Sequence, residues 1–222
     1  MRTPRDALLG PADAACLLCG GHAPRALEAH ARAYHRCPVC DLLFVATEHH
    51  PAAERCRARY EKHRNDASDA GYTGFLRLAA DELQCRLRPG ARILDFGCGP
   101  EPVLVGMLLQ LGFDATGHDP LFHPELSPAG PYEAVVATEV FEHLQDPAAT
   151  LGQLAGMLAP RGLLVLLTLL VRPQTVLLDW WYLRDETHVV FGSERTFEWI
   201  GARFGFEVEH TDGRRVVVLR KR

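Results

Sequence analysis

The sequence has no apolar run long enough to cross a membrane. Its longest mostly apolar stretch, Leu163 to Val171, is less than half of the about 20 residues that a bilayer-spanning helix needs. The N-terminal region also has no apolar signal core. We therefore expect a cytoplasmic protein with no membrane span.

Basic charge is scarce in the C-terminal part. Residues 91–222 contain 11 Lys and Arg against 17 Asp and Glu, whereas residues 1–90 contain 13 against 11. A protein that binds a nucleic-acid backbone usually presents a basic face, because neutralising phosphates supplies most of the affinity. Nucleic acid is therefore not an expected partner of this chain.

The seven cysteines form no even disulfide set, and in a reducing compartment metal ligation is the expected use of paired ones. Cys16 and Cys19 form one Cys-x-x-Cys pair, and Cys37 and Cys40 form a second after 17 intervening residues. Two such hairpins can place four thiolates at the corners of the tetrahedron that structural zinc requires. A redox role is disfavoured because each pair would need its own explanation. The spacing predicts a zinc ribbon.

A short apolar run, Arg92–Phe96, leads into the most informative loop of the chain. Asp95, Gly97 and Gly99 follow one another at alternate positions, and an apolar run from 103 to 111 comes next. Glycine is needed where the backbone turns sharply at unusual dihedral angles. The pattern predicts a strand, a glycine loop and a helix. A dinucleotide-binding loop would place a third glycine where Pro102 stands.

This loop resembles the first motif of class I S-adenosylmethionine (SAM)-dependent methyltransferases, an acid followed by two glycines at alternate positions. The resemblance implies that the loop holds the methionine part of SAM. It also implies that Asp119, which closes the next apolar run, accepts hydrogen bonds from the ribose hydroxyls. The cofactor-binding residues expected on this basis are Asp95, Gly97, Cys98, Gly99, Asp119 and Glu139.

Strands that alternate with helices predict a parallel sheet, while the Asp212-Gly213 turn predicts a final hairpin with an antiparallel last strand. The fold class is thus α/β, a Rossmann-like class I methyltransferase sheet preceded by a small zinc-ribbon module. The loop from 120 to 131 leaves little room for another strand, so the sheet is expected to be one strand short.

Three regions follow from these patterns. Residues 1–48 are the zinc-ribbon module with a frayed N-terminal tail. Residues 49–89 are a helical linker and a docking helix expected at 75–88, with a loop at 66–74. Residues 90–222 are the SAM-binding methyltransferase domain.

The segment from Glu139 to His143 resembles the Glu-x-x-Glu-His set of ubiquinone-biosynthesis O-methyltransferases and small-RNA 2′-O-methyltransferases. The resemblance implies that Glu139, Glu142, His143 and His188 hold a catalytic Mg²⁺ or Mn²⁺ ion, with a helical turn from Glu139 bringing the first three together. Glu142, His143 and His188 are the expected catalytic residues. Two alternatives stay open: either histidine acts as the base without metal, or Glu142 and His143 only cap a loop.

The richest aromatic patch includes Trp180 and Trp181, in a segment inserted after the strand that ends near Thr168. These rings would either cover the acceptor site as a lid or pack the insert onto the sheet.

The function expected from these patterns is SAM-dependent methylation, with O-methylation of a small-molecule acceptor. One alternative keeps the enzyme but makes RNA or protein the acceptor, with the ribbon as docking module. The other is a zinc-ribbon binding protein that retains the methyltransferase fold only as a scaffold.

Overall fold

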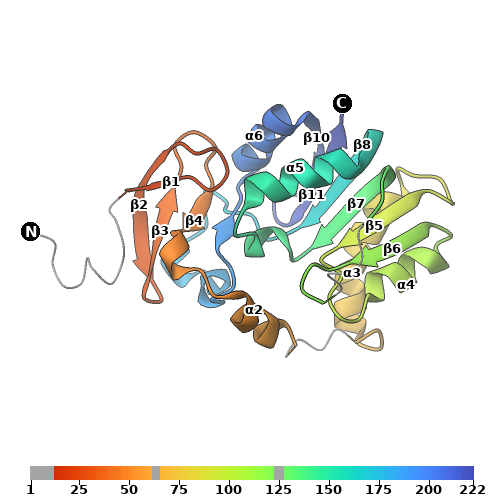
Figure 1. Cartoon of the computed structure of the whole chain (residues 1–222), viewed down its shortest axis with the longest axis horizontal. Coiled ribbons are helices and arrows are strands. Elements are labelled where there is room, and N and C mark those ends of the chain that lie inside the picture. The colour runs from red at the N-terminus through yellow and green to blue at the C-terminus, as the bar shows by residue number, and fades with distance from the viewer. Residues whose placement is uncertain (1–12, 62–65, 123–127) are drawn as a thin grey trace, which may run out of the picture.

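Two β-sheets form the framework of the chain (Figure 1). The structure is a computed structural model that describes residues 13–61, 66–122 and 128–222. The smaller sheet has the order β1-β2-β3-β4-β9. Its strands are β1 (Asp13–Ala15), β2 (His22–Ala29), β3 (Arg32–Arg36), β4 (Leu43–Val45) and β9 (Val190–Phe191).

The larger sheet has the order β10-β11-β8-β7-β5-β6. β5 pairs in parallel with both β6 and β7, and β7 pairs in parallel with β8, whereas β11 is antiparallel to both of its neighbours. The parallel sheet with an antiparallel last strand is therefore confirmed. Its strands are β5 (Arg92–Phe96), β6 (Asp114–His118), β7 (Tyr132–Thr138), β8 (Leu158–Leu167), β10 (Phe206–Thr211) and β11 (Val216–Lys221).

The connection between β6 and β7 is short, as expected. Among its described residues, 119–122 and 128–131, there is no helix and no strand. Over the described residues, the larger sheet thus has six strands.

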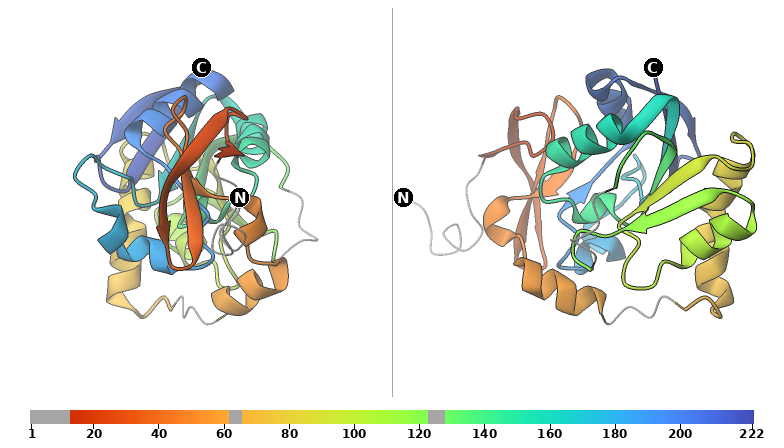
Figure 2. Two further views of the ribbon diagram at one scale, coloured as in Figure 1. Left: turned by 90° about the vertical axis from the view of Figure 1, so that its left-hand side faces the viewer. Right: turned by 45° about the vertical axis from the view of Figure 1, so that its right-hand side comes forward.

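Helices cover both faces of the larger sheet (Figure 2). The α-helices are α2 (Ala53–Tyr60), α3 (Ala70–Gln84), α4 (Val103–Gln110), α5 (Pro147–Met157) and α6 (Glu194–Phe204), and the 3₁₀ turns are η1 (Thr47–His49), η2 (Phe141–His143), η3 (Leu177–Asp179) and η4 (Trp181–Arg184). No helix in the described part of the chain is both long enough and apolar enough to span a bilayer.

The loop expected at 66–74 is wrong in its second half, because α3 already begins at Ala70. The carboxylate of Asp69 accepts hydrogen bonds from the N–H groups of Gly71 and Tyr72, which satisfies the first turn of the helix. The capping aspartate was the signal in the sequence that marked this start. Part of the linker helix expected before it, residues 62–65, lies outside the described residues.

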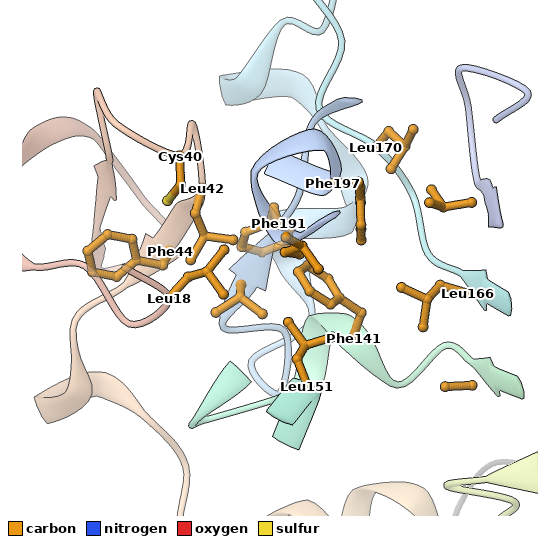
Figure 3. Packing of buried hydrophobic residues seen from close by; sticks show 14 of the residues in the cluster. Leu18, Cys40, Leu42, Phe44, Phe141, Leu151, Leu166, Leu170, Phe191 and Phe197 are labelled. Carbon is orange, nitrogen blue, oxygen red and sulfur yellow. The ribbon is translucent and has the colours of Figure 1, made fainter. Parts of the chain in front are cut away.

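Two hydrophobic cores lie on opposite faces of the larger sheet. The core beneath α3 and α4 includes Leu83 and Leu108 with Ile93 of β5. The core beneath α5 and α6 continues without a break into the smaller sheet, where Leu18, Cys40, Leu42 and Phe44 join Phe141, Phe191 and Phe197 (Figure 3). The region of the four cysteines therefore shares its core with the rest of the chain.

The smaller sheet is also shared. Its strand β9 comes from the C-terminal region and pairs antiparallel with β4, with Leu43 opposite Phe191 and Phe44 opposite Val190. The boundaries at 48 and 89 stay predictions, but the sheet crosses them.

Candidate active site

A cavity of about 360 Å³ lies at the carboxyl ends of β5, β6 and β7. This is the edge at which open α/β sheets bind ligands. Its walls include the expected cofactor residues Asp95, Gly97, Cys98, Gly99, Asp119 and Glu139, and also His143 and His188.

The glycine loop has the backbone that its sequence predicts. Gly97 has φ of 77° and Gly99 has φ of 68°, in the left-handed region that favours glycine. A Cβ atom on Gly97 would lie 2.5 Å from Cγ2 of Val140. At Gly97 a side chain is thus excluded by the neighbouring β7–η2 loop as well as by the backbone angle.

Asp119 links this loop to the end of β6. Its Oδ2 accepts a hydrogen bond from the N–H of Gly99 at 2.9 Å, and its Oδ1 accepts from the N–H groups of Leu121 and Phe122. Each carboxylate oxygen has further lone-pair capacity. Asp119 is therefore placed to shape the loop and to accept ligand hydroxyls.

Asp95 is buried, and its Oδ1 has no hydrogen-bond partner in the described part of the chain. Burial, followed by the nearby charge of Asp119, raises the pKa of the Asp95 carboxyl to about 7.

Cys98 is also a cavity residue, and burial raises the pKa of its thiol to about 12, so it stays protonated and is no nucleophile.

The raised pKa of Asp95 makes stability depend on pH. The Asp95 carboxyl has a pKa of about 7 in the folded chain, whereas an unperturbed aspartate in the unfolded chain has a pKa of about 3.9. Its contribution to the free energy of unfolding is therefore fully present below about pH 4 and is lost as the pH rises through 7. We expect Asp95→Asn, without ligand, to raise the free energy of unfolding by a few kcal/mol at about pH 8 and to have little effect at about pH 4. Denaturant unfolding at both pH values checks this. A variant no more stable than the parent at pH 8 would refute the burial of a charged group here.

The side chains of Glu142, His143 and His188 form a compact group. One potential ligand atom from each lies within 4.8 Å of the others. Nδ1 of His143 lies 3.0 Å from the carbonyl oxygen of Thr187, and Nδ1 of His188 lies 2.8 Å from that of Tyr182. A carbonyl only accepts, so Nδ1 carries the proton in both rings, and each Nε2 is the free nitrogen.

Burial lowers the pKa of both imidazoles, that of His188 to about 3, so both are neutral at physiological pH. In Glu142, Oε1 accepts a hydrogen bond from the hydroxyl of Tyr182, while the buried Oε2 has no partner among the described residues. Burial raises the pKa of this carboxyl. Two free imidazole nitrogens beside an unpartnered carboxylate oxygen are a donor set that fits a divalent cation.

Glu139 is not one of these three residues, and its role as a fourth ligand stays a prediction. The helical turn from Glu139 is absent, because η2 begins only at Phe141 and Glu139 has φ of 52°. Its Oε1 is nevertheless buried without a hydrogen-bond partner in the described region, and burial and the charge of Glu142 raise its pKa. Glu139 is thus a strained residue of the cavity wall.

The four predicted cysteines come together at the end of the smaller sheet where β3 ends and β4 begins. Their Sγ atoms all lie within 4.8 Å of one another, with 3.5 Å between Cys16 and Cys40 and 3.3 Å between Cys19 and Cys37. A disulfide would need about 2.05 Å, whereas tetrahedral zinc–thiolate bonds of about 2.3 Å place sulfurs near 3.8 Å apart. The spacing therefore fits a tetrahedral metal and no disulfide.

The model of a family described as "Methyltransferase domain" matches residues 60–211, which is more than half of the chain. The chain belongs to this methyltransferase family. The match begins at the end of α2 and includes the glycine loop, Asp119 and the Glu142–His188 group. The family predicted from the first motif is thereby confirmed.

Curated relatives of this methyltransferase chain cover it only in part. The ubiquinone biosynthesis O-methyltransferase of Caulobacter sp. (strain K31) is 32% identical over 155 residues, which are 59% of this chain and 51% of the relative. The protein of the same name from Bradyrhizobium sp. (strain ORS 278) is 33% identical over 113 residues, 40% of this chain and 44% of the relative. The chain thus spans about half the length of the curated relatives that it matches.

Solved structures share the fold. The 1,6-didemethyltoxoflavin-N1-methyltransferase of Burkholderia thailandensis, solved with S-adenosylhomocysteine, has a TM-score of 0.56 at 15% identity and covers 89% of this chain and 98% of its own. An O-methyltransferase family protein of the same species has a TM-score of 0.54 at 16% identity, over 78% and 64%. At such identities the likeness concerns the fold alone, and it confirms the Rossmann-like methyltransferase sheet.

The sequence did not indicate the aromatic wall of the methyltransferase cavity. Tyr60 of α2 and Tyr72 and Phe75 of α3 line it, although they come before the first motif. Helices were expected at Tyr60 and Phe75, but Tyr72 was expected in a loop, and a helical pattern does not tell which face meets a ligand.

The lid hypothesis for the tryptophans is not supported, because neither Trp180 nor Trp181 lines this cavity. Trp180 packs against the core, while Trp181 is 57% exposed. The neighbour that matters for the site is Tyr182, which is fully buried and reaches Glu142.

Proposed function

We propose that the chain is a SAM-dependent methyltransferase that transfers a methyl group to a hydroxyl of a small-molecule acceptor. One observation supports this most: a single cavity is lined by the glycine loop with Asp119 and by the two neutral imidazoles of His143 and His188. In this proposal the methyl donor and the proton-removing site share one cavity. The relatives named ubiquinone biosynthesis O-methyltransferase support oxygen as the accepting atom.

In this proposal Gly97 and Gly99 let the main chain approach the methionine part of SAM, and Asp119 accepts hydrogen bonds from the ribose hydroxyls. Methyl transfer from a sulfonium needs alignment of sulfur, methyl and acceptor more than covalent help. The rings of Tyr60, Tyr72 and Phe75 in the cavity wall keep water away from the aligned sulfur, methyl group and acceptor.

We further propose that Glu142, His143 and His188 hold a divalent ion, Mg²⁺ or Mn²⁺. Such an ion lowers the pKa of a bound hydroxyl and so prepares it for methylation. The chain's own contribution is orientation: carbonyl groups fix both Nδ1–H tautomers, and Tyr182 fixes the Glu142 carboxylate. In the metal-free alternative, the free Nε2 of either histidine takes the proton itself.

For the cysteine cluster we propose one structural zinc ion. The distances between the four Sγ atoms fit a zinc ion, and the two cysteine hairpins have the same backbone turn. The residue after the second cysteine of each pair, Gly20 or Asp41, has a positive φ and donates its N–H to the carbonyl of the first cysteine. Both hairpins thereby point two sulfurs at one centre.

Two measurements separate this proposal from its alternatives. Titration calorimetry should show one SAM bound per chain, which a retained scaffold without a cofactor site would not. Nucleic-acid binding, if RNA were the acceptor, should weaken steeply with salt. We expect SAM binding and no such salt-dependent RNA binding.

Asp119→Ala should weaken SAM binding by about 1.5–3 kcal/mol, because the ribose hydroxyls and the Gly99 N–H lose a charged acceptor. Calorimetry of the parent and the variant measures the change. Asp114→Ala is a matched control, since Asp114 begins the same strand at its opposite, exposed end. Equal SAM affinity in parent and Asp119→Ala would remove this residue from the cofactor site.

A further inference from the structure

Arg32 of β3 is a buried arginine that meets main-chain carbonyls instead of a carboxylate. Its side chain lies in the smaller sheet, and the residue is 7% exposed. Nη1 donates to the carbonyl oxygens of Glu186 at 3.0 Å and His188 at 3.1 Å, and Nη2 donates to those of Leu183 at 2.6 Å and Asp185 at 3.0 Å. One guanidinium therefore gathers four carbonyls of a single short loop.

The same loop has further bonds on both sides. The hydroxyl of Tyr34, also on β3, donates to the carbonyl of Leu183 at 3.1 Å. The N–H of Val45 on β4 donates to the carbonyl of Val189, and the N–H of Val189 donates to the carbonyl of Glu142, each at 2.8 Å. The loop at 183–189 thus lies between the smaller sheet and the η2 turn, where the chain enters β9.

Both imidazoles of the candidate active site are hydrogen-bonded to this loop or to the residue directly before it. It includes His188 itself, and the carbonyl oxygen of Thr187 faces Nδ1 of His143. The carbonyl of Tyr182, the residue directly before the loop, faces Nδ1 of His188. If the loop shifts, the two carbonyls that hold the protons on Nδ1 shift with it, and Nε2 is no longer reserved as the free nitrogen.

We propose that Arg32 is a positioning residue by which the smaller sheet holds the 183–189 loop in place. The loop in turn keeps both imidazoles in the Nδ1–H tautomer that catalysis needs. The inference rests on the proposed methyl transfer for its kinetic part only. Arginine suits this place because its planar group has five donors in a fixed fork. Lysine has three donors on one nitrogen and cannot span four carbonyls.

The test compares Arg32→Lys and Tyr34→Phe with the control Arg25→Lys. Arg25 lies on the neighbouring strand β2 and pairs with Glu28 of the same strand, so its replacement leaves the loop untouched. The kinetic readout is the turnover number against the KM for SAM. The second readout is the tautomer of His143 and His188 in ¹⁵N-histidine NMR, assigned with His143→Gln and His188→Gln variants, and it needs no activity.

We expect Arg32→Lys to lower turnover about 10- to 100-fold, the range typical of residues that orient catalytic groups. The KM for SAM should stay within about twofold of the parent value, because the glycine loop is not touched. The Nδ1–H signals of both histidines should be lost or mixed with Nε2–H signals. Arg25→Lys should behave as the parent, and Tyr34→Phe should show a smaller effect of the same kind.

Folded Arg32→Lys protein with unchanged turnover and unchanged tautomers would overturn the inference. If Arg32→Lys does not fold, Tyr34→Phe decides by the same two readouts. If the parent itself transfers no methyl group, the proposed function fails, and the tautomers alone decide: retained Nδ1–H signals in Arg32→Lys overturn the positioning role, and lost ones support it.

Discussion

Cys37→Ser should release the zinc ion and stop methyl transfer, while SAM still binds. Loss of one thiolate opens the metal site, and structural zinc contributes on the order of 10 kcal/mol to small metal-dependent folds. The cysteine hairpins share one core and one sheet with Phe191, Val190 and the loop before them. We therefore expect no methyl transfer once the zinc-dependent fold is lost. The measurements are zinc content, thermal unfolding, turnover and SAM calorimetry.

Cys85→Ser is the matched control for this change. Cys85 is an exposed single cysteine just after α3, outside the cluster. The Cys85→Ser protein should keep its zinc, its unfolding profile and its turnover. Cys37→Ser protein that retains one zinc and melts like the parent would contradict the four-thiolate site.

Removal of the proposed divalent ion should have a similarly large effect on turnover. With the ribbon zinc left in place, a chelator should stop methyl transfer, and added Mn²⁺ or Mg²⁺ should restore it. Glu142→Gln should lower turnover about 10²- to 10⁴-fold, because the amide offers neither the charge nor the second oxygen of the carboxylate. His188→Ala should do the same, since it removes one free Nε2.

The control for these variants is His210→Ala. His210 lies on β10 outside the cavity wall, where its Nε2 is 3.6 Å from a carboxylate oxygen of Glu82. Its replacement should leave turnover unchanged. Activity that is indifferent to chelation and to metal would leave the histidines as bases without an ion, and full activity in His188→Ala would exclude that residue from the mechanism.

The order of strands and helices in the larger sheet was predictable because it depends on local signals. Asp95 with its two glycines, the apolar run from 103 to 111 and the Asp212-Gly213 turn each determine the backbone within a few residues. The structure shows a strand, a helix and a hairpin at these places. The cluster of the four cysteines was equally predictable, since their spacing along the chain alone favours a four-thiolate site.

Contacts between distant segments were not predictable in the same way. Nothing near Val190 or Phe191 indicates that they extend the sheet of residues 13–45, because a two-residue strand has no periodicity. No signal in the sequence singles out Arg32, because arginine is mostly exposed and the carbonyl of Leu183 that it binds lies 151 positions further along the chain.

The proposed metal-binding group shows both sides of this limit. Its histidines and Glu142 were predicted through a resemblance, but the expected helical turn from Glu139 is absent, since Glu139 adopts a left-handed backbone that no periodicity indicates. The partner of Glu142, Tyr182, could not be predicted, because the two residues lie 40 positions apart and no local pattern connects them.

The most direct test of the proposed function is methyl transfer from isotope-labelled SAM to a hydroxylated small molecule, followed by mass spectrometry. We expect one labelled methyl group on an oxygen of the acceptor, with S-adenosylhomocysteine formed in equal amount, in the parent and not in Glu142→Gln. Label found in RNA or protein, or bound SAM that yields no S-adenosylhomocysteine with any hydroxylated small molecule, would contradict it.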